Sequence, residues 1–210
     1  MVFYRESLYA GGMAPSPYTN LSHPLLIIIR GLPGSGKSYL ASSLQREFGH
    51  ENIVLLDPDA IDFESQAYKD HLAKQPEGDD PKVFPFRFSQ DKAYAGITAH
   101  KIIIWNQAFT NLEMFERMLG RLEAHAQTQG THLPVLIVEV AIDPAVAKQR
   151  VARRATDGGH DVDNENFERF LRDYTSFAGR NFEVLSVNGE DDITALVKIV
   201  ADRVGQLLAA

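Results

Sequence analysis

The stretch that most constrains the fold is residues 31–38, which read G-L-P-G-S-G-K-S. An apolar run, Leu25–Arg30, precedes this stretch, and an amphipathic run, Lys37–Phe48, follows it. The stretch matches G-x-x-x-x-G-K-[ST] at every fixed position and has the expected context of a strand before and a helix after. We therefore expect a strand and a helix joined by a turn whose backbone N–H groups surround phosphate oxygens.

Each residue type in this phosphate loop suits that chemistry. Glycines let the N–H groups turn inward, where side chains would block them. Lys37 can reach the β- and γ-phosphates of a nucleotide, and the Ser38 hydroxyl can ligate magnesium. The alternative, a chance glycine-rich turn, is disfavoured by the complete motif in its complete context. The predicted nucleotide-binding residues are Gly31, Leu32, Pro33, Gly34, Ser35, Gly36, Lys37, Ser38 and Tyr39.

The rest of the chain alternates short apolar runs with longer amphipathic ones. The apolar runs predict strands at Leu25–Arg30, Ile53–Leu56, 102–105, 134–142 and 182–187. The amphipathic runs predict helices at Lys37–Phe48, 59–75, 89–101, 111–129, Pro144–Thr156, 164–178 and 192–208. Strands separated by helices indicate a parallel sheet covered on both faces, in one α/β domain over residues 25–210. Residues 1–24 are expected to form an irregular N-terminal extension, and the proline-broken stretch 76–86 a loop.

Composition narrows the function classes. The formal net charge of -7 disfavours a large sequence-independent nucleic-acid surface. The absence of cysteine excludes disulfides, zinc–thiolate sites and a thiol nucleophile. The longest apolar runs are far shorter than the ~20 residues of a membrane-spanning helix, and the start lacks a signal-peptide pattern. We expect a cytoplasmic protein that does not contact membranes.

Two carboxylates follow the second predicted strand directly, in the sequence Asp57-Pro58-Asp59. Ligands of open parallel sheets bind at the carboxyl ends of the strands, so both carboxylates are expected beside the phosphate loop. One of them can accept the proton of an attacking hydroxyl, and the other can order magnesium or contact substrate. The alternative is that Asp59 caps the following helix, although one residue can do both.

The third predicted strand leads into Asn106, Gln107 and, a little later, Thr110. These side chains are neutral, which favours hydrogen bonds to substrate over a magnesium-binding carboxylate. Satisfaction of the loop's own polar groups is the alternative. Trp105 is expected to pack at the end of the strand.

Arginines cluster on the predicted helix after the fourth strand. Arg150 and Arg154 are four residues apart and share a helix face, whereas Arg153 lies about 100° away from Arg154. The glycine-containing loop 157–163 follows and suits a hinge. Such arginines can stabilise the charge of a phosphoryl group in transfer, while an exposed charged face is the alternative.

Taken together, these motifs resemble the zeta-toxin and polynucleotide-kinase branch of the P-loop kinases, small AAA-type ATP-binding enzymes. The phosphate loop, the strand that ends in Asp-Pro-Asp, and the segment R-V-A-R-R-A-T-D-G-G-H-D-V carry the resemblance. It implies a five-stranded parallel sheet in the order 2-3-1-4-5, with a lid around residues 150–170. It also implies a phosphotransferase that uses ATP and Mg²⁺ and transfers the γ-phosphoryl group to a substrate hydroxyl.

The resemblance implies roles for individual residues. Lys37 and the lid residues Arg150 and Arg154 would be catalytic, Asp59 the general base, and Asp57 a partner of Ser38 in holding magnesium. Arg169 and His160 would contact substrate. The sequence departs from the branch at Asp62, where relatives often carry Arg or Lys, and after the third strand, where they often carry Asp.

Several alternatives stay open at this point. Zeta-toxin relatives phosphorylate a nucleotide-activated amino sugar and polynucleotide-kinase relatives a nucleic-acid 5′ end, and the acidic charge disfavours the second. An ATP-dependent switch or binding module with slow hydrolysis is an alternative function. A toxin neutralised by a separate antitoxin protein is another.

Overall fold

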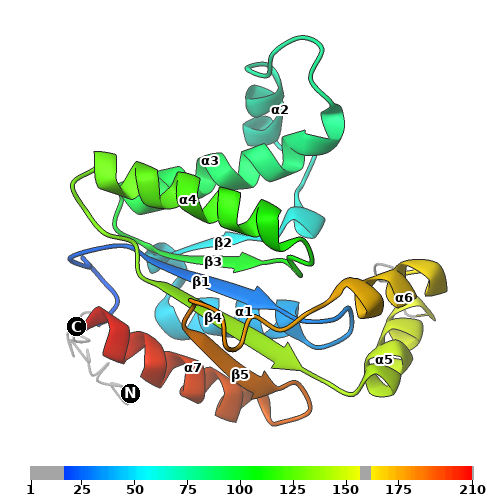
Figure 1. Ribbon diagram of the computed structural model, residues 1–210. Coiled ribbons are helices and arrows are strands. Elements are labelled where there is room, and N and C mark those ends of the chain that lie inside the picture. Colours follow the sequence, from blue (N-terminus) through cyan, green and yellow to red (C-terminus); the bar gives the residue numbers. More distant parts are fainter. Residues whose placement is uncertain (1–16, 157–161, 210) are drawn as a thin grey trace, which may run out of the picture.

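The fold is built around one five-stranded parallel sheet, and the computed structural model describes residues 17–156 and 162–209. The strand order is β2-β3-β1-β4-β5 (Figure 1). This confirms the predicted P-loop fold class and its strand order. The strands are β1 (Leu25–Arg30), β2 (Ile53–Leu56), β3 (Ile102–Asn106), β4 (Val135–Ala141) and β5 (Val184–Asn188).

Helices cover both faces of the sheet. Helices α1 and α7 pack on one face and α3 and α4 on the other, while α5 and α6 extend beyond the carboxyl ends of the strands (Figure 1). None of the described helices is long and apolar enough to cross a bilayer. The α-helices are α1 (Lys37–Phe48), α2 (Gln66–Leu72), α3 (Phe84–Thr98), α4 (Leu112–Thr128), α5 (Pro144–Thr156), α6 (Asn164–Asp173) and α7 (Ile193–Leu208). Three 3₁₀ turns are η1 (His50–Asn52), η2 (Pro58–Ala60) and η3 (Pro81–Val83).

The central strand β1 supplies both halves of the core. Leu25, Ile27 and Ile29 pack into the cluster with α1 and α7, whereas Leu26 and Ile28 pack into the cluster with α3 and α4. Side chains alternate across a strand, so a strand covered on both faces needs apolar residues at every position. The unbroken apolar run before the phosphate loop therefore fits a central strand.

One predicted helix, over residues 59–75, is wrong in its first half. The chain forms η2, then a turn, and α2 begins only at Gln66. In that turn the Asp62 side chain accepts a hydrogen bond from the N–H of Glu64, and Ser65 caps α2 by accepting one from the N–H of Tyr68. Asp and Ser compete with helix bonding in this way, which delays the helix.

The predicted start of the next helix at Ser89 is also wrong, because α3 begins at Phe84. Pro85 occupies the first turn, where its missing N–H costs no hydrogen bond. Ser89 lies inside the helix, and its hydroxyl donates to the carbonyl oxygen of Pro85 at 3.1 Å. Two of the three prolines in the predicted loop therefore lie in the first turn of a helical segment, Pro81 in η3 and Pro85 in α3.

The remaining predicted ends differ by a few residues. The largest difference is in α6, predicted to reach residue 178 but ending at Asp173. In the described part of the predicted N-terminal extension, residues 17–24 contain no helix or strand. Tyr18 packs edge-on against Phe48 of α1, with ring centroids 4.5 Å apart.

The early end of α6 follows from a buried ion pair between β1 and β4. Arg30 and Glu139 face each other across the two strands at 2.6 Å, with 0% and 5% of their surfaces exposed. Glu139 also accepts hydrogen bonds from the Ser176 hydroxyl and the Phe177 N–H, and Arg30 donates to the Thr175 carbonyl. These bonds take up polar groups that a longer α6 would have used within the helix.

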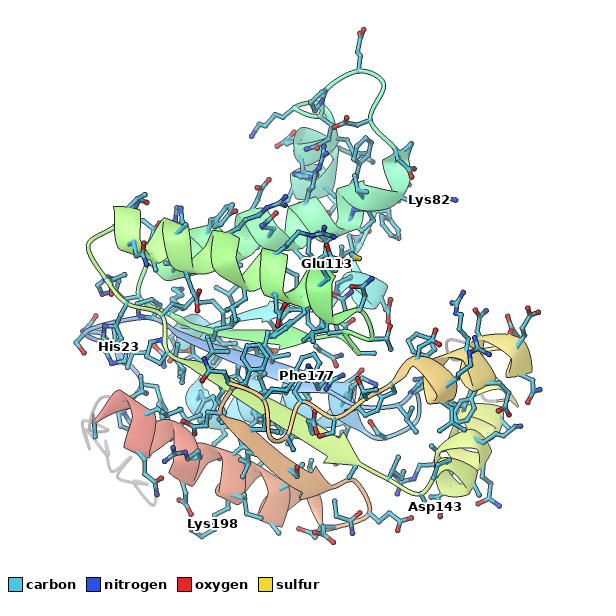
Figure 2. All side chains as sticks on the ribbon, in the orientation of Figure 1. His23, Lys82, Glu113, Asp143, Phe177 and Lys198 are labelled. Atoms are coloured by element: carbon cyan, nitrogen blue, oxygen red, sulfur yellow. The ribbon has the colours of Figure 1, made fainter. Side chains whose placement is uncertain are left out.

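The same arginine holds a second loop and two aromatic rings. Its guanidinium donates to the carbonyl oxygens of Ala108 and Phe109 in the β3–α4 loop. It also lies over the rings of Tyr174 and Phe177, at 4.5 and 3.5 Å from their centroids; Figure 2 labels Phe177. Arg30 thus joins four segments at the base of the phosphate loop.

Removal of this cation should be costly. We expect Arg30→Met to lower the free energy of unfolding by about 3–5 kcal/mol, because Glu139 would stay buried without a counter-charge. The measurement is urea unfolding followed by fluorescence of Trp105, the single tryptophan. Glu139→Gln in the Arg30→Met background should recover part of the loss, since the amide oxygen still accepts a hydrogen bond. A loss below about 1 kcal/mol would mean that the pair is solvated or replaceable.

Candidate active site

The phosphate loop joins β1 to α1 at the carboxyl end of the sheet. Its turn uses left-handed backbone at Gly34 and Gly36, with φ of 82° and 98°. Gly36 is the N-cap of α1 and provides no side-chain cap, so the first N–H groups of the helix remain for another acceptor. A helix start of this kind binds anions such as phosphate.

Two neighbouring segments press on the loop and fix its shape. A Cβ added at Gly34 would lie 2.4 Å from the carbonyl oxygen of Ala147 on α5. A Cβ added at Gly189, in the β5–α7 loop, would lie 2.3 Å from the carbonyl oxygen of Ser35. Both distances are too short for any side chain, so these glycines let α5 and the β5–α7 loop contact the phosphate loop backbone directly.

Lys37 is the electrostatic centre of the site. Its ammonium donates to the carbonyl oxygen of Leu32 at 2.9 Å. Burial lowers the pKa of Lys37 to about 8, against the opposing attraction of Asp59 and Asp57 and with a further lowering by the positive charge of Arg154. Three residues that the sequence assigned to the site therefore act on this lysine.

Asp57, Ser38 and Asn106 form one hydrogen-bonded group beside Lys37. The Asn106 amide nitrogen donates to the Asp57 carboxylate at 2.6 Å and to the Ser38 hydroxyl at 2.9 Å. Asn106 is 5% exposed, and its Oδ1 atom is buried without a hydrogen-bond partner. Burial raises the pKa of Asp57, while the bond from Asn106 opposes that rise.

This group fits a magnesium ion. The Ser38 hydroxyl and the Asp57 carboxylate are hard oxygen ligands of the kind that Mg²⁺ takes. Asn106 presents its amide nitrogen to both of them as a donor and therefore holds the two ligands together. The sequence had assigned Asn106 to substrate, and the structure shows that it bridges the predicted magnesium ligands Ser38 and Asp57. Its contact with substrate stays a prediction.

Asp59 lies on η2 with an exposed side chain. Its N–H donates to the Asp57 carboxylate at 3.1 Å, which makes Asp57 the N-cap of that turn. Helix α2 is capped by Ser65. The alternative that Asp59 caps the following helix is therefore wrong, and its carboxylate faces solvent near Lys37 and Asp57.

The residues after β3 divide into those used by the fold and those open to the site. Trp105 is fully buried, which confirms its packing role, and its indole N–H donates to the Gln107 side-chain oxygen at 3.0 Å. Gln107 thus accepts a hydrogen bond from the buried indole of Trp105, which fits the alternative that these residues satisfy polar groups of the fold. Thr110 is half-buried in the same loop. Substrate binding by Gln107 and Thr110 stays a prediction.

The arginines of α5 take different positions. Arg150 donates to the carbonyl oxygen of Gly189 at 2.9 Å and so joins α5 to the β5–α7 loop. Arg153 and Arg154 are both exposed, but only Arg154 is among the charges that act on Lys37. This difference agrees with the helix phase predicted from the sequence.

The remaining lid candidates lie on α6 or outside the described residues. Arg169 is exposed on α6. The N–H of Asn166 and, to a smaller extent, the charge of Arg169 lower the pKa of Asp163, the N-cap of α6. Gly158, Gly159 and His160 lie outside the described residues.

Sequence reasoning missed the β5–α7 loop. Gly189 touches the phosphate loop and receives a hydrogen bond from Arg150, although no site residue was predicted there. A signal was present, because Asn188 and Gly189 follow an apolar strand at the carboxyl end of the sheet, where ligand sites collect.

Comparison with solved structures places the fold among known relatives. A putative kinase from Chloroflexus aurantiacus J-10-fl aligns with a TM-score of 0.61 at 18% identity, over 86% of this chain and 98% of that one. Kti12 from Chaetomium thermophilum, solved with ADP-AlF3, aligns at 0.55 and 18% over 88% and 100%. A gluconokinase from Sinorhizobium meliloti 1021 aligns at 0.55 and 13% over 89% and 95%. At these identities the likeness establishes the fold alone.

Comparison by sequence identifies the family. A search of the curated proteins finds no significant match. The family model described as an AAA domain matches residues 26–177, which include the phosphate loop, both carboxylates and the arginine helix α5. Since this match spans well over half of the chain, the protein belongs to this AAA domain family and carries a P-loop, kinase-like domain.

Proposed function

We propose that this protein is an ATP- and Mg²⁺-dependent phosphotransferase that moves the γ-phosphoryl group of ATP onto a hydroxyl of a second substrate. The observation that carries the proposal is the position of Asp59, an exposed carboxylate whose charge acts on the Lys37 ammonium. A nucleotide-dependent switch needs a phosphate loop, but it needs no general base beside the transferred group. The position of Asp59 therefore favours a transferase.

The phosphate loop would hold the triphosphate. The first N–H groups of α1 would face the phosphates, and Lys37 would exchange the Leu32 carbonyl for the β- and γ-phosphate oxygens. Ser38 and Asp57, positioned by the Asn106 amide, would hold Mg²⁺, which, when bound, offsets the negative charge of the phosphates. These contacts would put the γ-phosphorus at the carboxyl end of the sheet.

Asp59 would then act as the general base. It accepts the proton of the acceptor hydroxyl while that oxygen forms a bond to the γ-phosphorus. The bond from the γ-phosphorus to the bridging oxygen breaks, and ADP leaves with the electron pair. Lys37 compensates the charge that develops on the phosphoryl oxygens.

The lid arginines would act in the transition state. Arg154 already lies within electrostatic reach of Lys37. Arg150 would join it by exchanging its bond to the Gly189 carbonyl for a phosphate oxygen. Arg169 and His160 stay predicted contributors from the segment that follows α5.

The acceptor is proposed to be a small hydroxyl-bearing molecule. The net charge of -7 disfavours a nucleic-acid 5′ end, whose binding relies on cationic contacts along the backbone. The resemblance to zeta-toxin kinases supports a nucleotide-activated sugar.

The lowered pKa of Lys37 predicts how ATP binding depends on pH. Below about pH 8 the lysine is protonated, so binding takes up no proton and affinity should be constant. Above that pH the free enzyme must first bind a proton, and at about pH 9 the affinity should be roughly tenfold lower. Isothermal titration of ATP across this range measures it. Lys37→Arg keeps its charge and should remove the dependence. An affinity that stays constant to pH 9 in the native protein would contradict the account.

The role of Asp59 as general base is tested by replacing its carboxylate with the amide of asparagine. Asp59→Asn should lower the rate of phosphoryl transfer by roughly 10²-fold or more, with little change in ATP affinity, because the amide cannot accept the proton. Asp57→Asn is the matched variant, and its main effect should be a higher Mg²⁺ requirement. Radiolabelled ATP in a transfer assay measures both. If Asp57→Asn is inactive at saturating Mg²⁺ while Asp59→Asn is normal, the assignment is reversed.

The role of Arg154 is tested by comparing it with its neighbour Arg153, which points to another side of α5. Arg154→Ala should lower kcat by roughly 10²-fold with a smaller effect on ATP affinity, since its charge is needed where charge develops. Arg154→Lys should rescue the rate only in part, because lysine lacks the planar fork. Arg153→Ala, one residue away, should be nearly silent. Equal losses at positions 153 and 154 would show that the lid phase is misassigned.

A further inference from the structure

A groove runs between α3 and α4 near the ends where both helices begin. It consists of two hollows of about 370 and 270 Å³. Phe86 and Arg121 line both hollows, so the two adjoin. Figure 2 labels Lys82, just before α3, and Glu113, in the first turn of α4, which locate the starts of the two helices.

The groove exposes apolar surface. Val83 and Met114 line it with 37% and 49% of their surfaces exposed, although both are large hydrophobic residues. Phe86 and Met118 add further apolar wall. A ring or an acyl chain laid along this surface would remove it from water.

The cations of the groove are not all matched by carboxylates. Arg87 pairs with Asp79, and Arg117 pairs with Glu113 at 2.9 Å. Arg121 forms no ion pair within the part of the chain that the structure describes. Arg121 is therefore the arginine of the groove that has no carboxylate within ion-pair distance among the described residues.

A second donor lacks an acceptor in the same groove. Gln90 lines the larger hollow, is 6% exposed, and has a buried amide nitrogen without a hydrogen-bond partner. The carboxylate that also lines this hollow, Asp91, is bonded to His71 at 3.0 Å. Buried donors are nearly always paired, so an unpaired one beside an unmatched arginine indicates a missing acceptor group.

We propose that this groove binds a small organic anion, with an apolar ring or chain against Phe86 and a carboxylate or phosphate group between Arg121 and Gln90. The volume of the hollows suits a small molecule. Although the protein as a whole carries -7, the unpaired guanidinium of Arg121 gives this groove a local positive charge with which an anion can pair. The inference needs no phosphoryl transfer and stands independently of the proposed function.

The groove also touches the support of the active site. The Phe86 ring packs against Trp105 of β3 at 5.6 Å between centroids. The next residue, Asn106, holds Ser38 and Asp57. An occupant that moves Phe86 would therefore be sensed by the single tryptophan of the chain, which supplies an intrinsic reporter.

The test uses a matched pair of probes on the full-length protein. One is 8-anilinonaphthalene-1-sulfonate, whose sulfonate stands in for a carboxylate or phosphate, and the other is the uncharged N-phenyl-1-naphthylamine. Energy transfer from Trp105 reports binding near Phe86. We expect saturable binding of the anionic probe, about tenfold tighter than that of the uncharged probe. The uncharged probe lacks the sulfonate that would pair with Arg121 and Gln90. Mg-ATP should not displace it.

Two variants and a control separate recognition from packing. Arg121→Ala should weaken binding of the anionic probe about tenfold and leave the uncharged probe unchanged. Gln90→Leu should weaken binding about threefold without lowering the thermal midpoint, because it removes an unpaired buried amide. Arg46→Ala removes an exposed arginine of α1, and it should change the binding of neither the anionic nor the uncharged probe.

Three results would overturn the proposal. The first is equal affinity of the anionic and uncharged probes. The second is displacement of the anion by Mg-ATP, which would place it at the phosphate loop. The third is unchanged anion binding in both Arg121→Ala and Gln90→Leu.

Discussion

The buried ion pair of Arg30 and Glu139 is the interaction on which the rest of the site depends. It lies one residue before the phosphate loop, in the interior of the sheet, where an unpaired charge would be most costly. Both partners must therefore find hydrogen bonds, and they find them on segments distant in sequence: the β3–α4 loop and the 174–177 segment after α6. The segment that follows the predicted lid is thus hydrogen-bonded to β1, the strand that leads into the phosphate loop.

Around this pair, backbone contacts rather than side chains define the phosphate loop. The loop lies against α5 at Ala147 and against the β5–α7 loop at Gly189, and both contacts leave no room for a Cβ. Arg150 connects these two neighbours through the Gly189 carbonyl. A movement of α5 would therefore be transmitted to the loop and to Gly189 together, which suits a lid that closes over bound nucleotide.

The sequence was most informative where structure is decided locally. The phosphate loop motif and its flanking strand and helix were predicted to the residue, because glycines and an unbroken apolar run determine them. The strand order came from a family resemblance and was confirmed. The predicted helix over 59–75 failed because Asp62 and Ser65 satisfy the backbone in a turn. The predicted end of α6 was wrong because the backbone groups of Thr175 and Phe177 bond to Arg30 and Glu139, which are more than thirty positions away in sequence.

The candidate site divides in the same way. Lys37, Ser38, Asp57 and Asp59 could be proposed from the sequence because each lies in a recognisable motif or follows a strand end, and the structure brings them together. The bridging role of Asn106 could not be predicted, since a neutral amide gives no sign in sequence that it will donate to both Ser38 and Asp57. Arg30 and Glu139 were visible only as charges inside apolar runs, and pairing between strands β1 and β4 was needed to give them meaning.

In the proposed reaction, the γ-phosphoryl group goes to a hydroxyl rather than to water. The most direct measurement incubates the purified protein with Mg²⁺ and γ-labelled ATP, together with pooled metabolites, nucleotides or RNA, and identifies the labelled products. The account predicts label in one small-molecule pool as a stable phosphate ester, and none with Lys37→Ala. Release of label only as inorganic phosphate, at the same slow rate with every pool, would contradict it and indicate a nucleotide-dependent switch.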